Sequence, residues 1–278
     1  MSHYEFKRKA SDGLSLYFQG WQTEQNQKGV ICLVHGLGEH SGRYEYWSGL
    51  LNQAGYSVLS YDLRGHGKSG GLRGYISSFD EYLADTDLLL QEAEGRYHGT
   101  PLFLYGHSLG ANIVSTYVLR RKPQLNGVII TGLSTRTALQ EQKAKIILAN
   151  IIGALAPKIT MKSGLDPFTI SRDPTVVSDY INDPLVHDQA SAGFGKSSIN
   201  AIGWINQHAS EWSLPILIMH GEADKLSYVE GSREFASKIK ADCTLKIWSG
   251  LTHEVHNEPE KDQVFEFLHQ WLDNHLIS

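Results

Sequence analysis

The sequence has few cysteines, no long apolar run and no apolar secretory core in its first ten residues. Only two of its 278 residues are cysteine, so a disulfide scaffold is not expected and a reducing compartment fits. No stretch reaches the roughly 18 consecutive apolar residues that a membrane-spanning helix needs, and residues 1–10 are polar and charged. We therefore expect a cytoplasmic protein.

Further absences narrow the function. The formal net charge is −5, and no run of Lys or Arg stands out, which argues against nucleic acid as a partner. Neither the metal-ligand spacing of Cys and His residues nor a dinucleotide-binding fingerprint is found, so we expect no metal and no organic cofactor. What is abundant is apolar sequence: 41% of the residues are hydrophobic, enough for a large core.

Short apolar runs alternate with stretches of helical periodicity, which predicts an α/β fold with a mostly parallel central sheet flanked by helices. The runs are rich in Val, Ile and Leu, as is typical of strands buried on both faces; they cover 30–34, 57–61, 102–105, 128–131, 216–219 and 245–248. Residues 4–21 alternate around a Ser-Asp-Gly turn and predict an antiparallel hairpin at the sheet edge. Predicted helices cover 79–94, 109–120, 227–240, where Ser227 and Glu230 form a capping-box pattern, and the stretch after 259.

Residues 134–212 do not follow this alternation. They hold helical patterns but no convincing core strand, and four prolines punctuate them. An insertion of this length between two strands is interpreted as a helical cap. The core then comprises residues 1–133 and 213–278. The most apolar part of the cap is the segment 144–156.

A nucleophile is predicted at Ser108. A buried strand leads into Gly106-His107-Ser108-Leu109-Gly110, and an apolar helix follows. This strand-turn-helix context is what the Gly-x-Ser-x-Gly motif of the α/β-hydrolase fold requires, because the two glycines make room for a sharp turn that lifts the serine hydroxyl above the sheet. The same five residues in an ordinary loop would carry no function.

A serine needs a base to take its proton and an acid to orient that base. In this fold the acid and the histidine follow the serine in the chain. Asp224 lies just past a strand end and is preferred over Glu222 and Asp242 on that placement. His253 and His256 both follow the last strand, and position alone does not separate them.

Two backbone amides are candidates for the oxyanion hole. One belongs to Leu109, next to the nucleophile, and the other to Leu37, in the glycine-rich turn after the first central strand. A second glycine-rich segment, Asp62-Leu-Arg64-Gly-His-Gly-Lys-Ser69, has the wrong spacing for a phosphate loop. It is interpreted as a structural turn in which arginine and aspartate pair.

Taken together, these motifs resemble the monoacylglycerol lipase and lysophospholipase family of α/β-hydrolases over most of the chain. The most telling mark is Glu39-His-Ser-Gly-Arg43-Tyr after the oxyanion turn, and the others are Asp62-Leu-Arg-Gly-His-Gly-Lys-Ser, Gly106-His-Ser-Leu-Gly, Ser171-Arg-Asp-Pro, Asp183-Pro-Leu, Gly221-Glu-Ala-Asp and His253-Glu-Val-His-Asn-Glu. The cap is the least similar region.

The resemblance implies a triad of Ser108, Asp224 and His253, so that His253 is chosen over His256. It also implies Leu37 and Leu109 as oxyanion donors. In relatives, the residues that match Glu39, Arg43 and His256 lie near the polar end of the substrate pocket, so these three are expected to bind substrate.

The expected reaction is hydrolysis of a lipid ester, above all a monoacylglycerol, through an acyl-enzyme on Ser108. The alternatives are a lysophospholipase, a short-chain carboxylesterase or a peptidase of the same branch and, in another class, a binding protein on a hydrolase fold. Ser108 argues against haloalkane or epoxide hydrolysis, which uses an aspartate nucleophile in this fold. The apolar segment 144–156 would receive acyl chains or make peripheral membrane contact; simple packing of the cap is the other interpretation.

Overall fold

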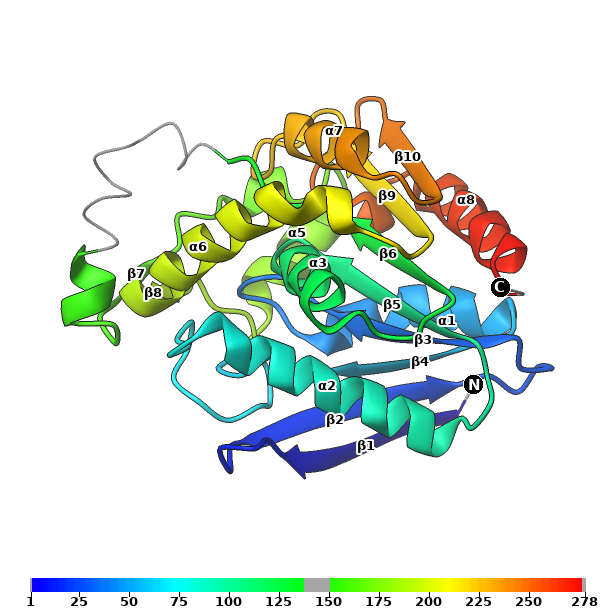
Figure 1. The fold of residues 1–278 in the computed structure, drawn as a ribbon, viewed down its shortest axis with the longest axis horizontal. Coiled ribbons are helices and arrows are strands. Elements are labelled where there is room, and N and C mark those ends of the chain that lie inside the picture. Colours follow the sequence, from blue (N-terminus) through cyan, green and yellow to red (C-terminus); the bar gives the residue numbers. More distant parts are fainter. Residues whose placement is uncertain (1, 138–150, 277–278) are drawn as a thin grey trace.

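An eight-stranded sheet forms the centre of the computed structural model, which describes residues 2–137 and 151–276 (Figure 1). Its strands are β1 (Ser2–Lys9), β2 (Ser15–Gln22), β3 (Gly29–Val34), β4 (Tyr56–Tyr61), β5 (Leu102–His107), β6 (Gly127–Thr131), β9 (Ile216–Gly221) and β10 (Cys243–Trp248). The order in space is β1-β2-β4-β3-β5-β6-β9-β10. The six strands β4, β3, β5, β6, β9 and β10 run parallel, and the β1–β2 hairpin is antiparallel at one edge.

Helices cover both faces of the sheet (Figure 1). Alternate residues of β3 point to opposite faces: Val30, Cys32 and Val34 join the core under α2 (Phe79–Arg96) and α3 (Leu109–Arg121). Ile31 and Leu33 join the core under α1 (Glu45–Gln53) and α8 (Lys261–Asn274). Burial on both faces explains why the strands read as unbroken apolar runs.

The predicted edge hairpin and all six predicted parallel strands are confirmed, with ends that differ by a few residues. Helix α1 was not predicted, because two of its four buried positions, Ser48 and Asn52, are polar. The capping box is wrong: α7 (Val229–Lys238) begins after Tyr228 without a side-chain cap. The Ser227 hydroxyl instead contacts the hydroxyl of Ser134, 2.6 Å away.

Between β6 and β9 the described chain leaves the main sheet. It forms η3 (Pro167–Thr169), α5 (Pro174–Asn182), α6 (Ala192–His208) and η4 (Ala209–Glu211). It also forms a small antiparallel sheet of β7 (Thr160–Lys162) and β8 (Gln189–Ser191), which the helical prediction missed. Residues 144–150 of the apolar segment lie outside the described residues, and the cap boundaries at 134 and 212 stay a prediction. Over the described ranges, no helix is long and apolar enough to cross a membrane.

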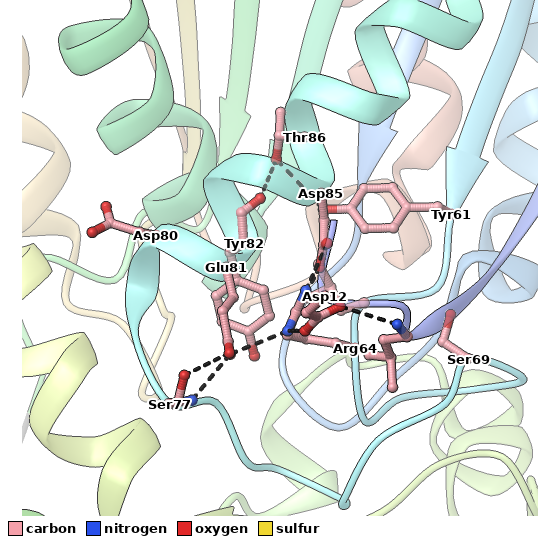
Figure 2. A network of polar contacts seen from close by, with 12 residues as sticks. Asp12, Tyr61, Arg64, Ser69, Ser77, Asp80, Glu81, Tyr82, Asp85 and Thr86 are labelled. Carbon is pink, nitrogen blue, oxygen red and sulfur yellow. Dashed lines mark hydrogen bonds and ion pairs between the residues drawn. The ribbon is translucent and has the colours of Figure 1, made fainter. Parts of the chain in front are cut away.

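Charged groups hold the turn after β4, but not by the predicted pair, because Arg64 and Asp62 bind different partners. Figure 2 shows the partners of Arg64. The Arg64 guanidinium forms two bonds to Asp85 on α2, of 2.7 and 2.8 Å. It also contacts Asp12 at 2.9 Å and Glu81 at 3.2 Å. We call Arg64 with these three carboxylates the Arg64 network; it joins the β1–β2 hairpin to α2. Asp62 accepts hydrogen bonds from Ser41 and the Lys68 amide.

Candidate active site

Ser108 lies on a sharp turn between β5 and α3, with φ 53° and ψ −114°. Positive φ is costly for a residue with a Cβ, and the tight turn has room to form because glycines stand two positions before and two positions after the serine. A Cβ on Gly106 would lie 2.4 Å from the Gly110 carbonyl oxygen, and one on Gly110 would lie 2.0 Å from that of Val34. The motif therefore has the conformation that the sequence predicted.

Asp224 and His253 come together at the carboxyl ends of β9 and β10. The His253 Nδ1 donates to Asp224 Oδ2 over 2.7 Å, and both residues are buried. The other carboxylate oxygen, Oδ1, accepts from the amides of Leu226 and Ser227 at 2.8 and 3.0 Å. This arrangement leaves the His253 Nε2 as the nitrogen available for a proton from elsewhere.

The pair shifts the two pKa values in opposite directions. Burial would raise the pKa of the Asp224 carboxyl, but its contacts with His253 and His220 outweigh burial and hold that pKa well below its usual range. Burial would lower the pKa of His253, but the Asp224 carboxylate outweighs it and raises that pKa above its ordinary value. The site therefore keeps Asp224 ionised and makes His253 a stronger base.

The rivals considered from the sequence lie apart from this pair. Glu222 accepts a hydrogen bond from Ser249, and Asp242 contacts His275 at the protein surface. His256 is buried and stacks on Tyr44, with 5.0 Å between ring centroids. Of these candidates, Asp224 and His253 are the acid and the histidine that contact each other.

A narrow pocket joins Ser108 to His253. It is lined by Gly36, Leu37, Glu39, His107, Ser108, Leu165, Ile170, Tyr180, His253 and Glu254. Its free volume is about 10 Å³, roughly the room for one water molecule. Leu165, Ile170 and Tyr180 reach it from the segment between β6 and β9, so that segment closes the pocket over the serine.

The two amides predicted for the oxyanion hole flank the serine. Leu109 is the first residue of α3, where an amide has no acceptor within its own helix, and Leu37 lines the pocket. Within residues 2–137 and 151–276, neither amide donates to a protein acceptor. Both can therefore donate to a substrate oxygen.

The residues predicted to bind substrate take different positions. Glu39 lines the pocket, whereas Arg43 and His256 are not among its lining residues. Arg43 lies behind the wall and bonds Glu39 and Glu254. His256 is 1% exposed and neither ring nitrogen has a hydrogen-bond partner among the described residues; burial lowers its pKa to about 4.

Sequence reasoning missed Glu254 as a wall of the pocket, although it directly follows His253. It also missed Leu165, Ile170 and Tyr180, which no motif marks because they come from the least patterned part of the chain. His107, which directly precedes Ser108 in the motif, lines the pocket as well. Its Nδ1 lies 2.9 Å from the Thr131 hydroxyl, and burial holds its pKa well below the usual range.

No group of three His, Cys, Asp or Glu in the described ranges could hold a metal ion.

Comparison with known proteins gives consistent relatives. The family model described as serine aminopeptidase, S33, matches residues 25–260. The chain is 33% identical over 266 residues to a monoacylglycerol lipase of Mycolicibacterium smegmatis, with 95% of each chain covered. It is also 33% identical to an abhydrolase domain-containing protein of Dictyostelium discoideum, in a match that covers 96% of this chain and 28% of that longer protein.

Among solved structures, the crystal structure of the Paleococcus ferrophilus monoacylglycerol lipase superposes with a TM-score of 0.85. That match is 33% identical and covers 99% of this chain and 100% of the other. The predicted α/β-hydrolase fold is thereby confirmed.

Proposed function

The chain belongs to the serine aminopeptidase S33 family and is a serine ester hydrolase, and from that premise we propose that it cleaves monoacylglycerols to fatty acid and glycerol. The observation that carries the proposal is a buried Asp224–His253 pair whose histidine lines one pocket with Ser108, a serine at positive φ. The names of the relatives supply the substrate class.

The proposed reaction assigns one role to each group. His253 Nε2 takes the Ser108 proton as the serine oxygen bonds to the ester carbonyl carbon, and the carbonyl oxygen becomes an oxyanion held by the amides of Leu37 and Leu109. The glycerol oxygen leaves with the proton from His253. Water, deprotonated by His253, then attacks the acyl-enzyme and releases the fatty acid and free Ser108. The structure gives no Ser108–His253 hydrogen bond within the described residues, and such bonds often tighten only with substrate.

The charge of the pocket favours a neutral head group. Its walls carry two carboxylates, Glu39 and Glu254, and one arginine behind them compensates for one of the two. An anionic phosphate head group would meet repulsion there, whereas the hydroxyl groups of glycerol can donate hydrogen bonds to carboxylates. This charge supports monoacylglycerol over anionic lysophospholipids as the proposed substrate.

A fluorophosphonate probe tests the nucleophile, and a substrate panel tests the substrate. We expect a covalent adduct on Ser108 by mass spectrometry and none in Ser108→Ala. Fatty-acid release should be fastest from monoacylglycerols, slower from zwitterionic lysophosphatidylcholine and slowest from lysophosphatidylglycerol of the same acyl chain. Turnover of short esters only would keep the mechanism and reject the lipid substrate. An intact protein with no adduct would favour a binding protein.

We also propose that the segment between β6 and β9 touches a lipid surface. Its described part exposes large apolar side chains: Leu155 is 82% exposed and Phe168 is 74% exposed, and Ile151, Ile159 and Met161 are each more than half exposed. Several exposed large apolar side chains within one segment of the chain support interfacial contact.

The test is sedimentation with phosphatidylcholine vesicles. The double variant Leu155→Ser with Phe168→Ser should bind vesicles several-fold less than the wild type and keep its rate on a soluble short-chain ester. Leu245→Ser, which changes an exposed leucine on β10, is the matched control. Equal binding of wild type and double variant would reject the contact.

A further inference from the structure

Three buried charged side chains connect the two loops that the proposed mechanism uses. Glu39, Arg43 and Glu254 form a continuous series of ion pairs, and we call these three residues the Arg43 clamp. Arg43 Nη1 donates to Glu39 Oε2 and to Glu254 Oε1, each over 2.7 Å. The carboxylate side chains are each 3% exposed and the arginine side chain is 10% exposed. Such desolvated pairs are rigid because little water is present to compete for their hydrogen bonds.

The first arm of the clamp holds the oxyanion turn. Glu39 Oε1 accepts the Gly36 amide over 2.6 Å and the Tyr44 hydroxyl over 2.9 Å. Both oxygens of Glu39 are therefore already engaged, one by this turn and one by Arg43. Gly36 directly precedes Leu37, so the carboxylate fixes the turn that aims the Leu37 amide at the reacting carbonyl.

The second arm holds the loop of the general base. Arg43 binds Glu254 through two nitrogens, with Nη2 donating to Oε2 over 2.8 Å. Glu254 directly follows His253, its amide donates to the Ile170 carbonyl over 2.8 Å, and its Oε2 accepts from the Asn257 amide group. A two-nitrogen contact fixes orientation as well as distance.

The surroundings show that Arg43 faces the carboxylates and not the pocket. The Tyr180 ring from α5 covers its guanidinium, 4.7 Å away. Burial would lower the pKa of Arg43, but the two carboxylates outweigh burial and raise it. Burial would likewise raise the pKa of Glu254, but Arg43 holds it down to about 2. Arg43 and Glu254 therefore stay charged over the pH range of ordinary assays.

We propose that Arg43 is a positioning residue that keeps the oxyanion turn and the His253 loop in register. The inference rests on the serine-hydrolase mechanism proposed above and differs from a role in binding the head group. A head-group ligand would act only on esters that carry glycerol. The clamp acts on the chemical step of every ester, because each one uses the same oxyanion donors and the same base.

The decisive substrates share an acyl group and differ in the leaving group: monodecanoylglycerol and p-nitrophenyl decanoate. In Arg43→Gln we expect kcat to fall by about 10²-fold or more on both esters, the size of a lost oxyanion contact. If Arg43→Gln kept the wild-type kcat on p-nitrophenyl decanoate, which has no hydroxyl groups, the proposed positioning role of Arg43 would be wrong. Should the wild type cleave that ester but not the glyceride, the proposed substrate fails and this test still stands.

A pH profile separates positioning from general loss of structure. The His253 ring is surrounded by titratable groups on several elements: Asp224 after β9, His107 on β5, His256 after β10, and the carboxylates Glu39 and Glu254. In Arg43→Gln the two carboxylates lose their counter-charge, so the acidic limb of kcat/KM should move to higher pH. Arg43→Lys keeps the positive charge but cannot make the two-nitrogen contact. The acidic limb of its kcat/KM profile should therefore stay at the wild-type pH, while its kcat should fall.

Two controls accompany these variants. Arg121→Gln removes an exposed arginine on α3 and should leave kcat and the limb unchanged. Fluorophosphonate titration counts folded sites, so each kcat refers to active molecules; if Arg43→Gln does not fold, Arg43→Lys carries the test through its kcat. Two results would overturn the proposal. One is a folded Arg43→Gln variant whose acidic limb of kcat/KM lies at the same pH as that of the wild type, and the other is an Arg43→Lys variant with the kcat of the wild type.

Discussion

The molecule buries two arginines among carboxylates, and the two differ in what they hold together. The Arg64 network joins the β1–β2 hairpin to α2, and none of its four residues lines the pocket. The Arg43 clamp joins the oxyanion turn to the His253 loop. The same ion-pair chemistry thus supports a joint between core elements at one place and the alignment of reacting groups at the other. The difference lies in the neighbours of each carboxylate.

Removal of the nucleophile separates the two regions most strongly. Ser108→Ala should lower kcat by about 10⁶-fold, the loss typical of a serine nucleophile. The hydroxyl makes no hydrogen bond to His253 among the described residues, so the free energy of unfolding should change by less than about 1 kcal/mol. Fatty-acid release and urea unfolding measure the two effects. Substantial residual ester hydrolysis would mean that the pocket is not the catalytic site.

Arg64→Met should show the opposite pattern. It leaves the Asp85 carboxylate, which is fully buried, without its charged partner. Breaking such a pair typically costs about 3–5 kcal/mol of folding free energy. The acyl transfer should be unaffected, so kcat/KM per fluorophosphonate-titrated site should match the wild type. A folded variant with a tenfold lower kcat/KM would erase the distinction between the two arginines.

The sequence predicted the fold, and it singled out Ser108, Asp224 and His253 as candidates, because these signals are local. A strand followed by Gly106-His107-Ser108-Leu109-Gly110 can be recognised within ten residues, and Asp224 and His253 each follow a strand end. The ion pairs could not be predicted, since Arg64 was expected to bind Asp62 and instead binds Asp85, 21 positions away. Pairing between distant segments depends on how the helices pack on the sheet, which no local pattern encodes.

The same limit applies to the pocket walls. Glu254 could have been suspected from its place after His253, but its partner Arg43 is 211 positions away. Leu165, Ile170 and Tyr180 come from a region where prolines and mixed polarity gave no period. The resemblance placed Arg43 near substrate; the structure places it behind the wall, with its guanidinium engaged by carboxylates.

The pH dependence of activity should depend on the surroundings of His253 and not on the Arg64 network. His253 must be neutral to accept the serine proton, so kcat/KM should fall about tenfold per pH unit below its pKa. The Asp224 carboxylate raises that pKa above the ordinary histidine value of 6.5, so the midpoint of the acidic limb should lie above pH 6.5. Initial rates on p-nitrophenyl decanoate measure it. Arg64→Met should keep the same midpoint; a shift there would mean that the two regions are electrostatically coupled.

An exposed arginine supplies the smallest effect and shows what burial contributes. Arg121 lies 3.5 Å from Asp87, and the two side chains are 44% and 35% exposed. Water and salt screen such a pair, so Arg121→Met should change the free energy of unfolding by less than about 1 kcal/mol and by less still at high salt. Urea unfolding beside Arg64→Met measures the contrast. If Arg121→Met lost as much unfolding free energy as Arg64→Met, burial would add nothing to the strength of an ion pair. The rigidity that we infer for the Arg43 clamp from its exclusion of water would then have no physical basis.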